Sequence, residues 1–160
     1  MGKVLNKFLN GYPGAVSRSA DTVILSLRNA SGGDIPFGAP VFLASDENAC
    51  RTFIDGSSTQ DNFLGFAVRA ADKTPDTYGS NQAAYGVGDP VDVLVRGSVG
   101  ISVETSAYTG NNVYIRKSDG KFVTSAGAEG STVLLPNVTV RTLRDTAQRA
   151  EVVVTKRNLL

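Results

Sequence analysis

The sequence predicts an all-β protein: a single compact antiparallel β-barrel or β-sandwich domain with an extended N-terminal arm. Three observations favour this class, namely a recurring glycine-led corner, long runs of alternating apolar and polar residues, and a hairpin turn of the Asp-Gly type. We assign residues 1–20 to the arm and residues 21–160 to the β domain.

The corner phrase occurs three times, as Gly38-Ala39-Pro40-Val41, Gly88-Asp89-Pro90-Val91 and Gly110-Asn111-Asn112-Val113. Glycine adopts backbone shapes that a Cβ atom resists, and proline is tolerated at the first residue of a strand. The valine that follows favours a pleated, half-buried surface. Each copy therefore predicts a tight corner that leads into a strand.

The clearest alternation covers residues 91–104, where valine and isoleucine fill most odd positions and polar residues fill most even ones. This period of two predicts a long strand with one buried face. Gly97 and Gly100 interrupt the strand and mark a bend or bulge, as at a barrel corner. Shorter alternating stretches around Phe66, Val140 and Val152 predict further strands.

Residues 112–125 predict a hairpin, because two β-rich stretches flank Ser118-Asp119-Gly120-Lys121. Asp-Gly suits the positive φ angles of a tight hairpin turn. Helix is scarce: short amphipathic turns are expected only at residues 4–9 and 142–148, and neither is long enough to be stable without packing.

Composition narrows the class further. The 160 residues suit one domain, and a net charge of +1 gives no general attraction to nucleic acid or to a membrane. Cys50 is the single cysteine, so it forms no internal disulfide and is expected to be a small buried thiol. The start of the chain is too polar for a signal peptide, and no apolar run could span a membrane, so we expect synthesis in a cytoplasm-like compartment.

The search for catalytic chemistry finds little. The chain has no histidine, which removes the commonest general base and any histidine-based triad or metal site. The glycine-rich Gly86-Val87-Gly88 leads into a strand rather than a helix, which argues against phosphate binding. We therefore expect no enzyme activity, no cofactor and no metal. A hydrolase with two paired carboxylates stays open as a remote alternative.

Two segments are candidates for contact with other proteins. The arm carries cations and interleaved apolar residues and no acidic residue, which suits an arm that orders on a neighbouring subunit, although a frayed terminus fits as well. The long loop at residues 70–86 carries two tyrosines, which either bind a partner or cover an edge of the core. The candidate contact residues are Lys3, Lys7, Phe8, Leu9, Tyr12, Arg18, Tyr78 and Tyr85.

Several phrases resemble the structural cement, or capsid decoration, proteins of tailed bacteriophages. The resemblance covers residues 20–155 and is carried by four stretches: Ile35-Pro36-Phe37-Gly38-Ala39-Pro40-Val41, Phe63-Leu64-Gly65-Phe66-Ala67-Val68, residues 88–100 and Val113-Tyr114-Ile115. It implies a small β-rich protein on the outer surface of the virion capsid. Such a protein would associate with itself, as a dimer or trimer, and would bridge and stabilise neighbouring subunits of the major capsid protein.

A second function is open. A carbohydrate- or receptor-binding β module of a phage tail or adhesin would also use exposed polar loops with tyrosines. The absence of tryptophan and a share of only 8% aromatic residues count against it, because sugars commonly stack on aromatic rings.

Overall fold

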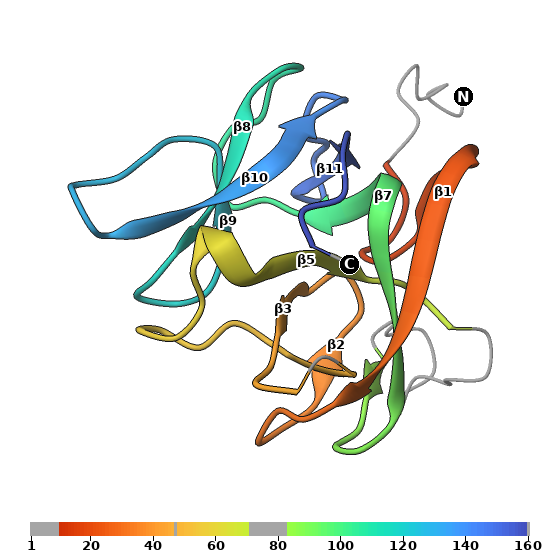
Figure 1. Ribbon diagram of the computed structural model, residues 1–160. Coiled ribbons are helices and arrows are strands. Elements are labelled where there is room, and N and C mark those ends of the chain that lie inside the picture. The colour runs from red at the N-terminus through yellow and green to blue at the C-terminus, as the bar shows by residue number, and fades with distance from the viewer. Residues whose placement is uncertain (1–9, 47, 71–82, 160) are drawn as a thin grey trace.

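The computed structural model describes residues 10–46, 48–70 and 83–159. These residues form a single β-rich domain, as the sequence predicts (Figure 1). The elements in chain order are β1 (Val16–Asn29), β2 (Ile35–Pro36), β3 (Pro40–Leu43), β4 (Ala49–Arg51), the 3₁₀ turn η1 (Gln60–Asn62), β5 (Phe63–Ala67), β6 (Ala84–Tyr85), β7 (Pro90–Ser102), β8 (Asn112–Arg116), β9 (Phe122–Val123), β10 (Thr132–Val140) and β11 (Arg149–Val154).

Five strands close into a ring. The order is β1-β4-β3-β5-β7, and β7 pairs again with β1. The pairs are antiparallel except β1 with β4, which meet only at Arg28 and Asn29. The small sheet of β2 and β6 lies outside this order. In Figure 1 this ring occupies the lower part of the molecule, with β1 on its right flank.

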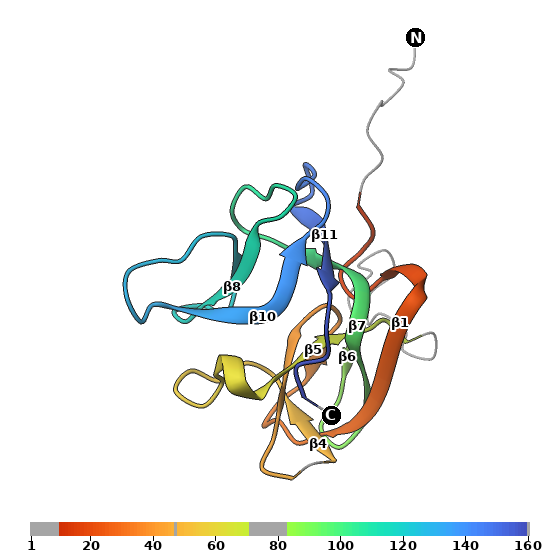
Figure 2. The same ribbon diagram turned by 45° about the horizontal axis from the view of Figure 1, so that its top comes forward.

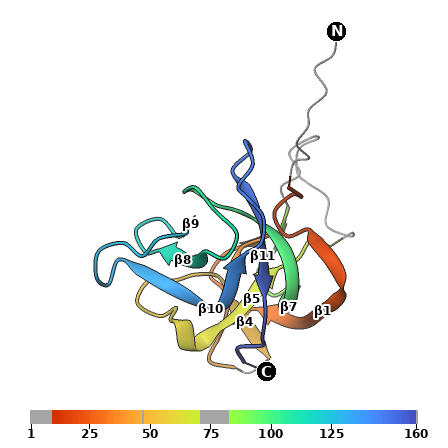
Figure 3. The ribbon, with the colours of Figure 1, turned by 90° about the horizontal axis from the view of Figure 1, so that it is seen from above.

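The remaining strands extend the same sheet from β7 through β11, β10, β8 and β9. A parallel bridge between Val103 and Phe122 then joins β9 to the residue just after β7, and Glu104 N–H donates to Phe122 O at 2.9 Å. The second half therefore also closes on β7. Seen from above, β8 and β10 lie on one side of the molecule and β1 and β7 on the other (Figure 3).

The long strand β7 serves both halves. Val91, Val93 and Val95 enter one buried cluster, whereas Val99 and Ile101 enter the other. The change occurs at Gly97, whose φ of +123° is one that L side chains rarely adopt. A Cβ atom there would also lie 3.1 Å from Thr22 Cα in β1. The odd-numbered valines of β7 therefore change cluster at the bend that the glycine pattern predicts, whereas Leu94, on the other face, already packs with Val99 and Ile101.

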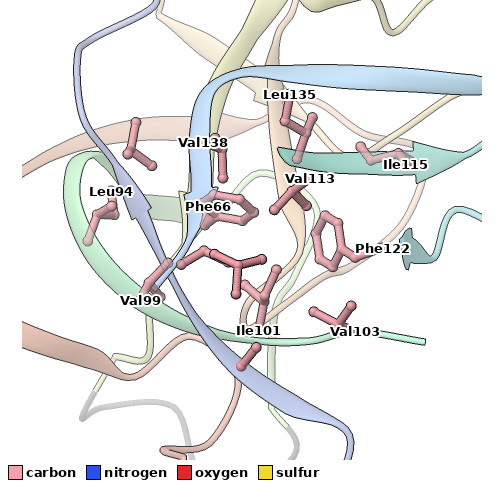
Figure 4. Packing of buried hydrophobic residues seen from close by; sticks show 14 of the residues in the cluster. Phe66, Leu94, Val99, Ile101, Val103, Val113, Ile115, Phe122, Leu135 and Val138 are labelled. Atoms are coloured by element: carbon pink, nitrogen blue, oxygen red, sulfur yellow. The ribbon is translucent and has the colours of Figure 1, made fainter. Parts of the chain in front are cut away.

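The buried cluster that Val99 and Ile101 enter draws residues from both halves, as Phe66 of β5 and Phe122 of β9 show in Figure 4. Phe42, Phe63, Phe66 and Phe122 form a chain of edge-on contacts with ring centroids 5.6 to 5.7 Å apart. Each such contact adds about 0.5–1.5 kcal/mol to the burial of the rings. This chain of aromatic rings therefore packs the ring of strands against β9 of the second half.

The other sequence predictions of local structure have different outcomes. The hairpin is confirmed as β8 and β9, and Gly38, Gly88 and Gly110 all have positive φ angles. The predicted helical turn at 142–148 is wrong, because the Asp145 carboxylate accepts the N–H groups of Ala147 and Arg149 in a non-helical turn. The predicted helical turn at 4–9 lies outside the described residues.

The predicted arm is part of the domain where the structure describes it. β1 begins at Val16, so the boundary expected after residue 20 falls inside a strand. Residues 10–15 also contact the domain, as described next.

Candidate functional site around residues 10–15

Residues 10–15 are fixed to the end of the domain by the side chain of Asn10. Its amide nitrogen donates to Leu143 O at 2.9 Å and to Arg149 O at 2.7 Å, and its amide oxygen accepts from Thr142 Oγ1 at 3.0 Å. The main-chain N–H of Asn10 donates to Asp145 Oδ2 at 2.8 Å. Asn10 therefore ties the start of the described chain to β11 and to the segment between β10 and β11, two strands that lie next to each other in Figure 2.

Tyr12 forms the second attachment. The guanidinium carbon of Arg149 lies 4.2 Å from the centre of the Tyr12 ring, and that of Arg69 lies 5.6 Å from it. A cation above an aromatic face is attracted by about 0.5–1 kcal/mol at an exposed site. The ring is still 43% exposed, so part of it remains available for contact.

Two glycines allow the chain to pass close to the core. Gly14 N–H donates to Gly100 O at 2.9 Å, and Gly14 O accepts from Arg69 N–H at 2.9 Å. A Cβ atom on Gly14 would lie 2.9 Å from Gly38 N, and both glycines have φ angles near +80°, at +79° and +78°. Residues 10–15 therefore pack as part of the body of the domain.

Exposed apolar side chains lie on the adjoining loops. Tyr108 is 61% exposed and Leu143 is 55% exposed. Their loops lie side by side, because Arg144 N–H donates to Ala107 O at 3.1 Å. Leu143 also provides a carbonyl to Asn10. We call Tyr12, Tyr108 and Leu143 the terminal patch.

A groove of about 1010 Å³ begins beside the same segment. Tyr12, Phe37, Phe53 and Phe122 contribute aromatic surface, and small or uncharged residues make up most of the rest, with charged side chains among them. Two groove carboxylates are already paired: Glu104 Oε2 lies 3.2 Å from Lys121 Nζ, and Asp119 contacts the guanidinium of Arg116. The hydrogen bond from Arg116 lowers the pKa of Asp119 and raises that of Arg116.

The structure describes only some of the predicted contact residues. Lys3, Lys7, Phe8, Leu9 and Tyr78 lie outside the described residues. Tyr12 and Arg18 are described and both approach β11. Arg18 Nε donates to Glu151 Oε1 at 2.9 Å while its side chain stays 57% exposed.

The prediction that Tyr85 is an exposed contact residue is wrong. Tyr85 is buried in β6, where it pairs with Ile35. Its hydroxyl donates to Val68 O at 2.6 Å, and its ring packs edge-on against Phe37 with centroids 5.5 Å apart. The alternative that this ring covers the core is the one that the structure supports.

Sequence reasoning missed Asn10, Arg69 and Arg149. Each acts through partners more than 50 residues away in the chain, so no local pattern marks them. The expectation for Cys50 is confirmed: the thiol is buried, and burial raises its pKa to about 11.

No group of three or more potential metal ligands occurs within residues 10–46, 48–70 and 83–159. None of the helices in this part of the chain is long and apolar enough to cross a membrane.

Comparison with known proteins identifies the family. The profile of the family described as "Structural cement protein (E217 gp24/Pam3 gp6)" matches residues 3–156, which is nearly the whole chain. The chain belongs to this family of phage structural cement proteins. Membership assigns it a structural role in the virion capsid.

A solved structure supports the fold. A chain from the structure described as "The capsid of Myoviridae Phage XM1" is similar with a TM-score of 0.72 and 16% sequence identity, and the similarity covers 97% of this chain and 96% of that one. At this identity the likeness concerns the fold. A comparison with curated protein sequences found no match.

Proposed function

We propose that this cement protein binds the outer surface of the phage head and bridges neighbouring subunits of the major capsid protein, acting as a symmetric oligomer without enzyme activity. The observation that carries the proposal is the attachment of residues 10–15 beside the terminal patch. It places the chain that follows residues 1–9, a stretch with two lysines and several apolar residues, beside exposed apolar groups of the domain. Two contact regions on one body are what a bridge between subunits requires.

The chemistry of the groove favours a binding role over catalysis. Of the three carboxylates among the described residues that line the groove, Glu104 and Asp119 each face a cation and are held as ion pairs, while Asp55 accepts the N–H of Gly56. The chain also contains no histidine. Several modest contacts within one oligomer then give persistent attachment, because each bound site raises the effective concentration of the next.

Co-sedimentation with mature, genome-free shells tests this proposal. The full-length protein is expected to pellet with shells to a saturating occupancy. Removal of residues 1–9 keeps Asn10 and should lower that occupancy at least about tenfold. Full-length protein that stays in the supernatant, or that binds a glycan array but not shells, would overturn the proposal.

Point variants separate the terminal patch from the rest of the surface. Leu143→Ser removes an exposed apolar side chain from the patch, and we expect weaker shell binding. Val87→Ser is the matched control, because Val87 is an apolar residue of similar exposure, at 61% against 55% for Leu143, and lies just before β7 rather than in the patch. Equal shell binding by both variants would exclude the patch from the contact.

A further inference from the structure

The outer edge of β1 is open. β1 pairs with β7 from Val16 to Arg28, but it meets β4 only at Arg28 and Asn29. Within the part of the chain that the structure describes, no strand lies along the other edge of residues 23–27. Figures 1 and 2 show β1 on the flank of the molecule, with β7 on its inner side.

The hydrogen bonds on β7 show which main-chain groups face this edge. Val68 N–H donates to Asp92 O at 2.8 Å, so the main-chain groups of Asp92 point toward β5 and away from β1. Asp92 lies opposite Ser26, and in an antiparallel pair both residues then point away from each other. The N–H and C=O groups of Ser26 therefore face outward.

The neighbouring residues agree with this alternation. Arg28 N–H donates to Asn48 O at 3.0 Å, on the outer side. The register from Ile24 to Arg28 is continuous, so Ile24 has the same orientation as Ser26 and Arg28. Ile24 and Ser26 thus present two N–H donors and two carbonyl acceptors at the open edge.

The side chains of this stretch suit a further strand. Residues 23–27 carry no charge, and Ile24 is 44% exposed. Val23 and Leu25 are only partly buried on the face that Leu27 shares. By contrast, the first part of β1 has register irregularities and the charges of Arg18 and Asp21, which are features that protect an edge strand.

We propose that two copies of this chain pair through the edges of β1, antiparallel, about a two-fold axis at Leu25. Ile24 of one copy then lies opposite Ser26 of the second copy, and each such pair exchanges two hydrogen bonds, giving four in all. Leu25 lies opposite Leu25 of the second copy, and Val23 lies opposite Leu27. This register pairs all the outward N–H and C=O groups of Ile24 and Ser26. It also brings together the three apolar side chains that share one face, Val23, Leu25 and Leu27.

Other registers are less favourable. An axis at Ser26 would place Ile24 opposite Arg28, whose N–H is already bonded to Asn48, so that only the Ser26 pair could exchange its two hydrogen bonds. With the axis at Leu25 the pairing ends at Val23 and Leu27, before Thr22 meets Arg28, and all four hydrogen bonds form. An axis at Val23 would place Arg18 opposite Arg28, which is a repulsive pair of like charges. An axis at Ile24 would extend to Thr22, beyond the irregularity between Val23 and Ile24. This self-complementarity identifies a second copy as the occupant.

The inference rests on the self-association in the proposed function but not on capsid binding, so it is tested without shells. Leu25→Cys, Ile24→Cys and Ser26→Cys are oxidised separately. Only residue 25 lies opposite itself, in a pair without hydrogen bonds whose Cα atoms are about 4.5 Å apart, within disulfide range. Cys50 is buried and remains reduced in all three variants.

We expect at least about fivefold more disulfide-linked dimer from Leu25→Cys than from the other two. Equal or greater linkage at residue 24 or 26, or no linkage at residue 25, would overturn the proposal. If the protein oligomerises without linkage at residue 25, the oligomer forms through another surface. That result would leave the proposal of shell binding untouched.

Sedimentation velocity with a proline variant provides a second test. Ser26→Pro removes an outward N–H but no bond to β7, and proline is tolerated on such edges. We expect at least about tenfold weaker self-association with an unchanged melting temperature, whereas Ser26→Ala should associate as the wild type does. Undiminished association of Ser26→Pro would overturn the proposal. Unfolding of Ser26→Pro would also overturn the proposal, because it would show that the Ser26 N–H is needed within a single copy of the chain.

Discussion

Gly65 of β5 packs directly against the main chain of Leu94 in β7. A Cβ atom on Gly65 would lie 1.9 Å from Leu94 O and 2.8 Å from Leu94 C. Main-chain atoms in a paired strand have little freedom to move away, so this position requires glycine. The contact lies where β5 joins the strand that both halves of the domain share.

We therefore expect Gly65→Ala to lower the free energy of unfolding by at least about 3 kcal/mol, because the clash forces β5 away from β7. Urea denaturation followed by circular dichroism measures this effect. Gly32→Ala is the matched control, since a Cβ atom there has no neighbour within 4 Å. Similar stability of the two variants would contradict the packing described.

Tyr85→Phe tests the structural role of the buried tyrosine. Loss of the hydroxyl leaves Val68 O without this donor, and we expect a cost of about 1 kcal/mol in the free energy of unfolding with no change in shell binding. Tyr108→Phe removes an exposed hydroxyl and should leave stability unchanged. A stable Tyr85→Phe variant with impaired shell binding would restore the contact role.

Asn10→Ala tests the attachment of the N-terminal segment. The variant loses three side-chain hydrogen bonds, so we expect the free energy of unfolding to fall by about 1–2 kcal/mol and the amides of residues 11–15 to exchange faster. Hydrogen exchange with mass spectrometry measures both. Asn48→Ala, on an exposed turn, is the control; unchanged exchange at residues 11–15 in Asn10→Ala would refute the attachment.

The hairpin should show a pH dependence through Asp119. Its pKa is lowered in the folded state by the hydrogen bond from Arg116, so its contribution to stability is present above the unfolded value near 3.9 and is lost as the pH falls through the folded pKa. We expect wild type to melt slightly higher than Asp119→Asn at pH 7, and the difference to shrink below the unfolded value and to vanish below the lowered folded pKa. High salt should reduce the difference, because both side chains reach solvent. A difference that grows on acidification would have the wrong sign.

Cys50 should be unreactive in the native protein. Burial raises its pKa to about 11, so the thiolate is scarce at pH 8 and the sulfur is also shielded from reagents. We expect an aromatic disulfide reagent to titrate no thiol at pH 8 and one thiol after unfolding. Rapid labelling of the native protein would show that this part of the core is open.

The elements that local chemistry determines could be predicted from the sequence. The hairpin depends on Asp119-Gly120, the corners on glycines with positive φ, and the long strand on the alternation of residues 91–104, and each of these signals lies within about a dozen residues. The closure of two halves on β7 could not be predicted, because it depends on pairings such as Val103 with Phe122 that no local pattern encodes.

The candidate site was harder to predict for the same reason. Tyr12 could be proposed because it is one of the apolar residues interleaved with cations in residues 1–20. Its attachment, however, depends on Arg149, 137 residues later in the chain. Tyr85 was misplaced because a tyrosine in a glycine-rich stretch resembles a loop residue, whereas pairing with Ile35 takes it into the core.

Calorimetry of genome-free shells, with and without the purified protein, tests whether it acts as a cement. Bridging of neighbouring subunits predicts that the disruption temperature of the shells rises with occupancy and then saturates. An unchanged disruption temperature at saturating occupancy would show that the protein decorates the shell without strengthening it.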